Sequence, residues 1–220
     1  MRLRLLCPIA GLLLSWGGAA QAAVIADFVT DFSITANPNG AWAYGTTTSL
    51  GGGLTLLTNP LDASGGGDVR YDWNPGPRTP LVGVLIPGSG SPAGILHPGA
   101  GGEMATARYT VQTSFTGFLD VAFMAGSPFA TTDVHVARNG VSLFDAPINP
   151  SNALQTYQAT LTLQAGDTLD FVAGWGADSA INFDTTTFTA ILSETTVPEP
   201  ASLAMLALGV LGLTALRRRP

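Results

Sequence analysis

Apolar and polar residues alternate along much of the chain between residues 23 and 196, with the two-residue period of a β-strand. The clearest single strand is predicted at residues 154–163. From Tyr157 onward its odd-numbered positions are apolar, and its even-numbered positions are Gln or Thr. Such alternation is typical of a strand with one face on a core and one face in water. No stretch of this region longer than two turns has the spacing of an amphipathic helix, so the pattern indicates an all-β region.

A hairpin is predicted over residues 132–145. Val134 and Val136 alternate with polar neighbours on the first arm. Asn139-Gly140 follows, and these residue types favour the positive φ angles of a two-residue hairpin turn. Residues 141–145 then return as the second arm.

The remaining strands are predicted from runs of Val, Thr, Phe, Leu and Tyr bounded by Gly, Pro, Asn and Asp. They lie at residues 26–32, 53–58, 69–73, 81–86, 105–113, 117–125, 169–173 and 183–192. A chain of strands without crossover helices favours an antiparallel β-sandwich of jelly-roll type. Segments 72–80 and 87–102 are rich in Pro and Gly and are predicted as connectors. The second is long for a structureless loop, so we expect it to wrap a sheet edge or hold a site.

The first 22 residues follow the three-part pattern of a secretory signal peptide. Basic Arg2 and Arg4 precede an apolar run at residues 5–16, and Ala20-Gln21-Ala22 forms an A-x-A-like cleavage site. Cleavage there would remove Cys7, the only cysteine of the chain. The predicted domain at residues 23–196 would then have no disulfide and no Cys-ligated metal.

The other end of the chain carries a second targeting pattern, at residues 197–220. Pro198, Glu199 and Pro200 precede an apolar run at residues 201–216, and Arg217, Arg218 and Arg219 follow. A 16-residue helix spans about 24 Å, and flanking residues and local thinning can adapt it to a hydrocarbon core of about 30 Å. The arginines would stay in the cytoplasm. We therefore predict a C-terminal hydrophobic helix at 201–216 that crosses the inner membrane.

Residues 197–220 resemble the PEP-CTERM sorting signal, in which a Pro-Glu-Pro motif precedes an apolar helix and a basic end. All three parts occur here in the same order. The resemblance implies that an exosortase, a membrane transpeptidase-like enzyme, recognises the tail and removes it. It further implies an exported protein that is transiently membrane-anchored and then reaches the cell surface or the extracellular material, where polysaccharide is a candidate partner.

The region between the two ends also resembles a recurrent domain of exported bacterial proteins, many of which carry PEP-CTERM tails. The resemblance rests on short motifs, including Asn37-Pro38-Asn39-Gly40, Leu96-His97-Pro98-Gly99 and Ala165-Gly166-Asp167-Thr168. In outline this domain is similar to carbohydrate-binding jelly rolls. The resemblance implies no established activity.

Charge excludes one class of partner. Without the two ends, the chain keeps four of its nine basic residues, all arginine, and fourteen of its fifteen acids, a formal charge of −10. Such a surface repels phosphate backbones, so we expect no nucleic-acid binding.

Residues suited to catalysis are scarce. His97 and His135 are the only histidines, and the chain has no G-x-S-x-G turn and no His pair at i, i+4. This disfavours a Ser-His-Asp hydrolase and a zinc site. Glycoside hydrolysis needs two opposed carboxylates, and no pair stands out among the acids. We expect no enzymatic activity, with a glycoside hydrolase as the less favoured alternative.

Calcium is the one candidate cofactor, because it prefers carboxylate and carbonyl oxygens. The candidate ligands flank two predicted turns and are Asp167, Asp170, Asp178, Asn182 and Asp184. The alternative is that these side chains make turns through local hydrogen bonds.

Four aromatic residues near strand ends are candidates for stacking on sugar rings, namely Trp42, Tyr44, Trp73 and Trp175. The alternative is that each caps the core. The sequence thus favours a non-catalytic, exosortase-sorted protein of the cell surface or extracellular matrix. The alternative function is a carbohydrate-binding module, with or without calcium.

Overall fold

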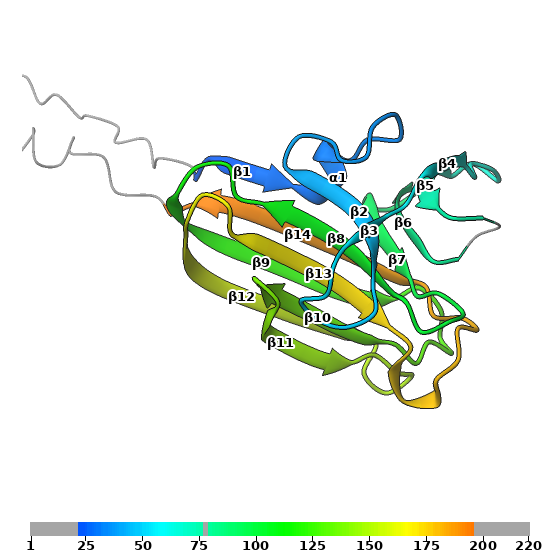
Figure 1. The fold of residues 1–220 in the computed structure, drawn as a ribbon. Helices are drawn as coiled ribbons and strands as arrows, with labels where there is room; N and C mark the ends of the chain where they lie inside the picture. The colour runs from blue at the N-terminus through cyan, green and yellow to red at the C-terminus, as the bar shows by residue number, and fades with distance from the viewer. Residues whose placement is uncertain (1–21, 77–78, 196–220) are drawn as a thin grey trace, which may run out of the picture. The chain divides into compact units, whose positions relative to one another are not determined.

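Two antiparallel β-sheets form the part of the chain that the computed structural model describes, residues 22–76 and 79–195 (Figure 1). Residues 23–195 make one compact unit. The predicted signal peptide, the 201–216 helix and the sorting motif lie outside the described residues. In the described ranges, no helix combines the length and apolar character that crossing a membrane requires.

The larger sheet has eight strands. Its order is β12 (Leu154–Leu163), β9 (Phe115–Ala125), β14 (Thr186–Glu194), β7 (Ala93–His97), β6 (Leu81–Ile86), β5 (Val69–Asn74) and β4 (Asn59–Asp62), and β1 (Val24–Asp27) pairs with β14.

The smaller sheet has six strands. Its order is β11 (Val141–Pro147), β10 (Asp133–Arg138), β13 (Thr168–Gly174), β8 (Met104–Thr110), β2 (Trp42–Thr47) and β3 (Thr55–Leu56). From β8 to β14 the chain passes back and forth between the two sheets, as in a jelly roll. The predicted antiparallel sandwich of jelly-roll type is therefore confirmed.

The two strongest local predictions are confirmed. The predicted hairpin is β10 and β11, with Val136 opposite Phe144 and positive φ angles of 49° at Asn139 and 78° at Gly140. Val134 and Val136 are buried, as their alternation predicts. The predicted strand 154–163 is β12 with the same bounds.

The predicted strand 26–32 is wrong in its second half. The chain leaves β1 after Asp27 and makes one helical turn, α1 (Phe28–Asp31). The Asp27 carboxylate accepts from the Val29 amide at 3.0 Å, and the Asp31 carboxylate accepts from the Asp27 amide at 3.0 Å. These two side chains satisfy the main-chain donors that a strand would have offered to a neighbour.

The predicted connector 87–102 is also wrong, because it contains β7, which lies inside the larger sheet between β14 and β6. The reason is a close approach at Gly94. A Cβ atom there would stand 2.4 Å from the Phe188 ring and 2.7 Å from the Phe28 ring. Glycine at this position serves packing in a strand, whereas its frequency in the segment suggests a loop.

The core lies between the sheets, and aromatic rings meet at its centre. Phe28 is fully buried, and its ring centroid lies 4.5 Å from that of Phe188, 5.2 Å from Trp42 and 6.0 Å from Tyr44. The single turn of α1 thus inserts an aromatic side chain that joins both sheets. This packing fixes the position of α1, which contributes to one wall of the cleft described below.

Candidate functional site

The described residues form a cleft of about 860 Å³. Its walls come from α1 and the segment after it, the β8–β9 loop, β1 and the end of β14. The lining residues are Ile25, Thr30, Asp31, Phe32, Ser33, Asn39, Gly40, Ala41, Trp42, Tyr109, Gln112, Thr113, Ser114, Phe115 and Glu194.

Asp31 organises the first wall. Its Oδ2 atom accepts from the Asp27 amide at 3.0 Å and from the Trp42 indole Nε1 at 3.1 Å. The Asp31 carbonyl accepts from the Asn39 side chain at 2.9 Å. One turn of helix and the following segment are therefore held as a single unit at the edge of the cleft.

Three of the four predicted aromatic site residues lie in the core behind this wall. Trp42, Tyr44 and Trp73 are 3%, 0% and 6% exposed, respectively, so their ring faces are in the core. The Trp73 indole donates to the Ser33 carbonyl at 2.6 Å, and the Tyr44 hydroxyl accepts from the Ser33 amide at 3.2 Å. Burial raises the pKa of Tyr44 to about 12. The structure therefore places these three rings in the core, as the alternative of core capping has it, and Trp42 alone of the three also lines the cleft.

Trp175, the fourth aromatic candidate, lies elsewhere and is half-buried. Its indole Nε1 donates to the Gly99 carbonyl at 2.5 Å. The ring therefore ties the segment after β13 to the β7–β8 connection, and it does not line the cleft.

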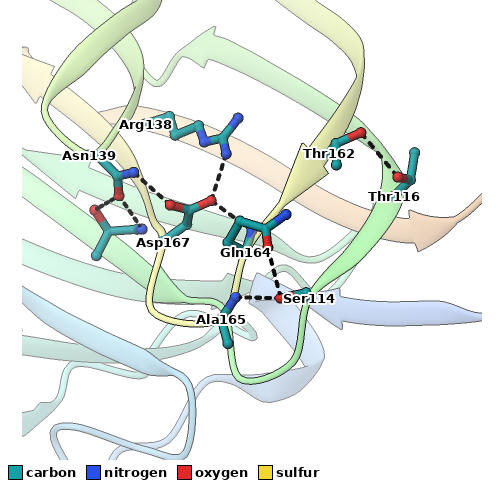
Figure 2. Close-up of polar contacts among 9 residues, drawn as sticks. Ser114, Thr116, Arg138, Asn139, Thr162, Gln164, Ala165 and Asp167 are labelled. Atoms are coloured by element: carbon teal, nitrogen blue, oxygen red, sulfur yellow. Dashed lines mark hydrogen bonds and ion pairs between the residues drawn. The ribbon is translucent and has the colours of Figure 1, made fainter.

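The second wall of the cleft is held by a polar network at the β12–β13 turn, drawn in Figure 2. The Ser114 hydroxyl accepts from the Ala165 amide at 2.9 Å and donates to the Gln164 side chain at 3.3 Å (Figure 2). These contacts join the β8–β9 loop to the turn, so Ser114 has a fixed position in the cleft wall.

Asp167, one of the predicted calcium ligands, is the centre of that network. Its carboxylate accepts from the Arg138 guanidinium at 2.7 Å, the Asn139 side chain at 2.7 Å and the Gln164 amide at 2.8 Å (Figure 2). The Gln164 amide and then the Asn139 side chain are the main causes that hold the pKa of Asp167 at about 2. Protein donors thus already occupy both of its oxygens.

Asp170, a second predicted ligand, is equally engaged. It is 1% exposed and lies directly opposite Arg108 in the β13–β8 pair. The guanidinium binds both carboxylate oxygens, at 2.6 and 2.8 Å. This geometry is the two-pronged arginine–carboxylate pairing that compensates a buried charge.

The other three predicted ligands lie beyond the far end of β13. Asp178 ends the short 3₁₀ helix η1 (Gly176–Asp178), Asp184 precedes β14, and Asn182 is exposed between them. Asp178 and Asp184 both contact the Thr131 hydroxyl, at 2.8 and 3.3 Å. The five residues therefore do not form one site. Among the described residues, no group of three or more His, Cys, Asp or Glu side chains is placed to hold a metal ion.

Neither histidine lines the cleft. His97 bonds the Pro98 carbonyl through Nδ1 at 2.8 Å. His135 lies between two carboxylates on the hairpin, with Nε2 at 2.9 Å from Asp133 and Nδ1 at 2.5 Å from Asp145. Burial lowers the pKa of His135, but the two carboxylates outweigh it and the net shift is upward.

This cluster predicts a pH-dependent stability. A raised folded-state pKa means that His135 stabilises the hairpin at low pH, below about 6.5, and that this contribution is lost as pH rises through the folded pKa. We expect His135→Gln to cost about 1 kcal/mol near pH 5.5 and clearly less at pH 8, measured by urea unfolding. His97→Gln is the control, because the hydrogen-bond partner of the His97 ring is the Pro98 carbonyl and not a carboxylate. A cost of His135→Gln that is constant or grows with pH would contradict the prediction.

Four residues that line the cleft have no distinctive pattern in the sequence. Phe32 and Phe115 are half-buried and line it, while Gln112 and Glu194 are exposed at its rim. Their only sequence signal is their place at strand ends. Their convergence depends on how the two sheets close, which a local pattern does not encode.

Comparison with known proteins gives one match in sequence and several weak ones in structure. The K3 adhesin domain of Lys-gingipain from Porphyromonas gingivalis is similar over 79% of this chain and all of that chain, at 13% identity and a TM-score of 0.38. A CBM35 from Paenibacillus barcinonensis covers 63% of this chain and 100% of its own, at 17% identity and a TM-score of 0.33. A family 35 carbohydrate-binding module from Clostridium thermocellum covers the same shares at 10% identity and a TM-score of 0.32. No curated protein matches the chain.

The sequence match is at the end of the chain. Residues 196–219 match the family model described as the PEP-CTERM protein-sorting motif. This confirms the resemblance of residues 197–220 to the sorting signal, and the motif implies processing by an exosortase. The motif implies export and transient membrane anchoring before release to the surface or the medium. The chain therefore carries a PEP-CTERM sorting motif and is an exosortase-sorted exported protein.

Proposed function

We propose that this exported protein acts without catalysis at the cell surface or in the extracellular matrix, and that it binds polysaccharide in the cleft. The observation that carries the proposal is the composition of the 860 Å³ cleft, which joins two half-exposed aromatic rings to a rim of hydrogen-bonding side chains. Its volume is in the range of ligand sites, roughly 300–1,000 Å³.

The chemistry of the cleft suits a sugar. A sugar ring has apolar C–H faces that pack on an aromatic ring, and hydroxyl groups around its edge that need donors and acceptors. Phe32 and Phe115 offer the apolar contact, and Gln112, Asn39 and Glu194 offer polar groups of both kinds.

Charge narrows the class of polysaccharide. Residues 23–196 carry a formal charge of −10, and the cleft itself contains Asp31 and Glu194. Uronic-acid or sulfated polymers would be repelled by this field. The favoured ligand is a neutral glycan.

One observation favours a second candidate function. Asp31 and Glu194 both line the cleft, and glycoside hydrolases use two carboxylates at the scissile bond. The Asp31 carboxylate already accepts two hydrogen bonds from the protein, which suits a structural role better than a catalytic one. The hydrolase is therefore the alternative, and the binding experiment separates the two by looking for products.

The test is calorimetry and array binding of the purified secreted protein against neutral and acidic glycans. We expect binding to a neutral glycan, and a loss of about tenfold in affinity for Phe115→Ala, equivalent to about 1.4 kcal/mol. Phe118→Ala removes an exposed ring that does not line the cleft, and its affinity should match that of the unmodified protein.

Two results would count against the proposal. Absence of binding across the panel, or equal affinity of Phe115→Ala, would show that the cleft is not a glycan site. Release of shorter sugars during incubation, lost in Glu194→Gln, would favour the hydrolase.

A further inference from the structure

Two loops meet at the end of β13 that is remote from the β12–β13 turn, and they carry three oxygen-bearing side chains. Thr131 precedes β10, Asp178 ends η1, and Asp184 precedes β14. None of them lines the large cleft. The inference drawn from them does not depend on the proposed glycan binding.

The three side chains converge on a shared point. The Thr131 hydroxyl oxygen lies 2.8 Å from Asp178 Oδ2 and 3.3 Å from Asp184 Oδ1. A hydroxyl group has a single proton and can donate to only one of two carboxylates. The Thr131 amide also donates to Asp184 Oδ1 at 3.1 Å. The Thr131 hydroxyl therefore cannot donate a proton to both Asp178 and Asp184, and one of these two oxygen–oxygen contacts has no hydrogen bond from it.

Asp184 has an oxygen that no protein donor reaches. The residue is 0% exposed, and its Oδ2 atom is buried without a hydrogen-bond partner. It belongs to the same carboxylate whose Oδ1 atom contacts the Thr131 amide and hydroxyl. A buried, half-satisfied carboxylate next to another acid is costly unless a positive charge is present. Burial, and to a lesser degree the negative charge of Asp178, raises the pKa of Asp184, and together they outweigh the lowering by the Thr131 hydrogen bonds and by the charge of His97.

We propose that Asp178, Asp184 and Thr131 bind one Ca²⁺ ion at this end of the sandwich. Neighbouring oxygens on a calcium ion, each 2.3–2.6 Å from the metal, are separated by roughly 2.8–3.5 Å. The two oxygen separations at Thr131 fall in that range. The unpartnered Asp184 Oδ2 supplies a further ligand, and water completes the shell.

Calcium fits this site better than other divalent ions. The three side chains offer oxygen alone, which disfavours zinc. The irregular arrangement of two carboxylates and a hydroxyl suits the flexible coordination of calcium, whereas magnesium requires a nearly ideal octahedron. With only two charged ligands, the expected dissociation constant is about 10⁻⁴–10⁻³ M, typical of extracellular modules.

The ion would also fix an exposed pair of rings. Phe129 and Phe183 are 65% and 61% exposed, and their centroids lie 5.5 Å apart. They stand two residues before Thr131 and one residue before Asp184. Calcium would therefore join the two loops that present these rings.

The test is calcium titration of the full secreted protein after chelation, followed by calorimetry and thermal unfolding. We expect one binding site and a rise in Tm of about 3–10 °C at 10 mM calcium. Magnesium at the same concentration should give a clearly smaller rise.

Asp184→Asn is the decisive variant. Without calcium it should be at least as stable as the unmodified protein, since it removes a buried charge, and calcium should no longer raise its Tm. Asp120→Asn, a half-buried acid on β9, is the matched control and should keep the full response.

Three outcomes would overturn the proposal. They are the absence of a calcium-dependent shift in the unmodified protein, an equal shift with magnesium, and a full calcium response in Asp184→Asn. None of these results bears on glycan binding in the cleft, so the two proposals fail separately.

Discussion

Replacing Arg108 by methionine is expected to lower the free energy of unfolding by about 3–5 kcal/mol. Arg108 binds both oxygens of Asp170, whose side chain is 2% exposed. Methionine keeps much of the side-chain volume but leaves the carboxylate buried and unpaired. The side-chain hydrogen bonds to Asp170 are also the main reason that the pKa of Arg108 is raised. Urea unfolding of the two proteins at pH 7 gives the difference directly.

Two further variants show whether the loss comes from the orphaned charge. Arg108→Met combined with Asp170→Leu removes both charges and should recover most of the lost stability, because a buried pair adds little over apolar residues of similar size. Arg138→Met breaks the more exposed pair with Asp167 and should cost clearly less than Arg108→Met. Equal losses in all three variants would contradict the explanation.

Replacing Phe28 by alanine is expected to cost about 3–5 kcal/mol of unfolding free energy. The ring is fully buried and packs on Trp42, Tyr44 and Phe188, so its removal leaves a cavity where the two sheets meet. A one-turn helix between strands has little stability of its own. We therefore expect α1 and the cleft wall to loosen together with the core.

Thermal and urea unfolding measure this effect, and Phe129→Ala is the control. Phe129 is 65% exposed, so losing its ring should change the stability by less than about 1 kcal/mol. A loss in Phe28→Ala no larger than that of the control would show that the aromatic centre does not support the fold. Glycan binding should also weaken in Phe28→Ala, because α1 forms part of the cleft wall.

Local pattern was sufficient for the regular strands. In β12 and in the β10–β11 hairpin, one face is buried and the other faces solvent. Apolar and polar residues therefore alternate, and the strands can be predicted from the sequence. In β2, five of six residues are buried, and the alternation disappears. Strand β7 was not predicted for another reason. Its Gly94 makes room for two aromatic rings, and glycine is not typical of strands. Packing by distant residues decides both strands.

The candidate site was less predictable than the strands. The sequence offered Trp42, Tyr44 and Trp73 either for stacking on sugars or for capping the core, and the structure places all three in the core. Of the candidate acids, Asp170 lies inside β13 rather than at a turn, and only Asp178 and Asp184 contact a common side chain. Whether a Trp is exposed, or an Asp is paired with an arginine, depends on the neighbouring strand and not on the residue itself.

The sequence by itself determined that this protein carries a sorting signal and that its structural class is all-β. The sorting motif at residues 196–219 is contiguous, and strand alternation is a local property, so both can be recognised from the sequence without knowing the fold. Tertiary structure alone decided which polar groups are neighbours. It pairs Asp170 with Arg108 across 62 positions and brings Asp184 to Thr131 across 53. Such contacts depend on the register between strands and on how the sheets close, and these follow from packing of the whole core.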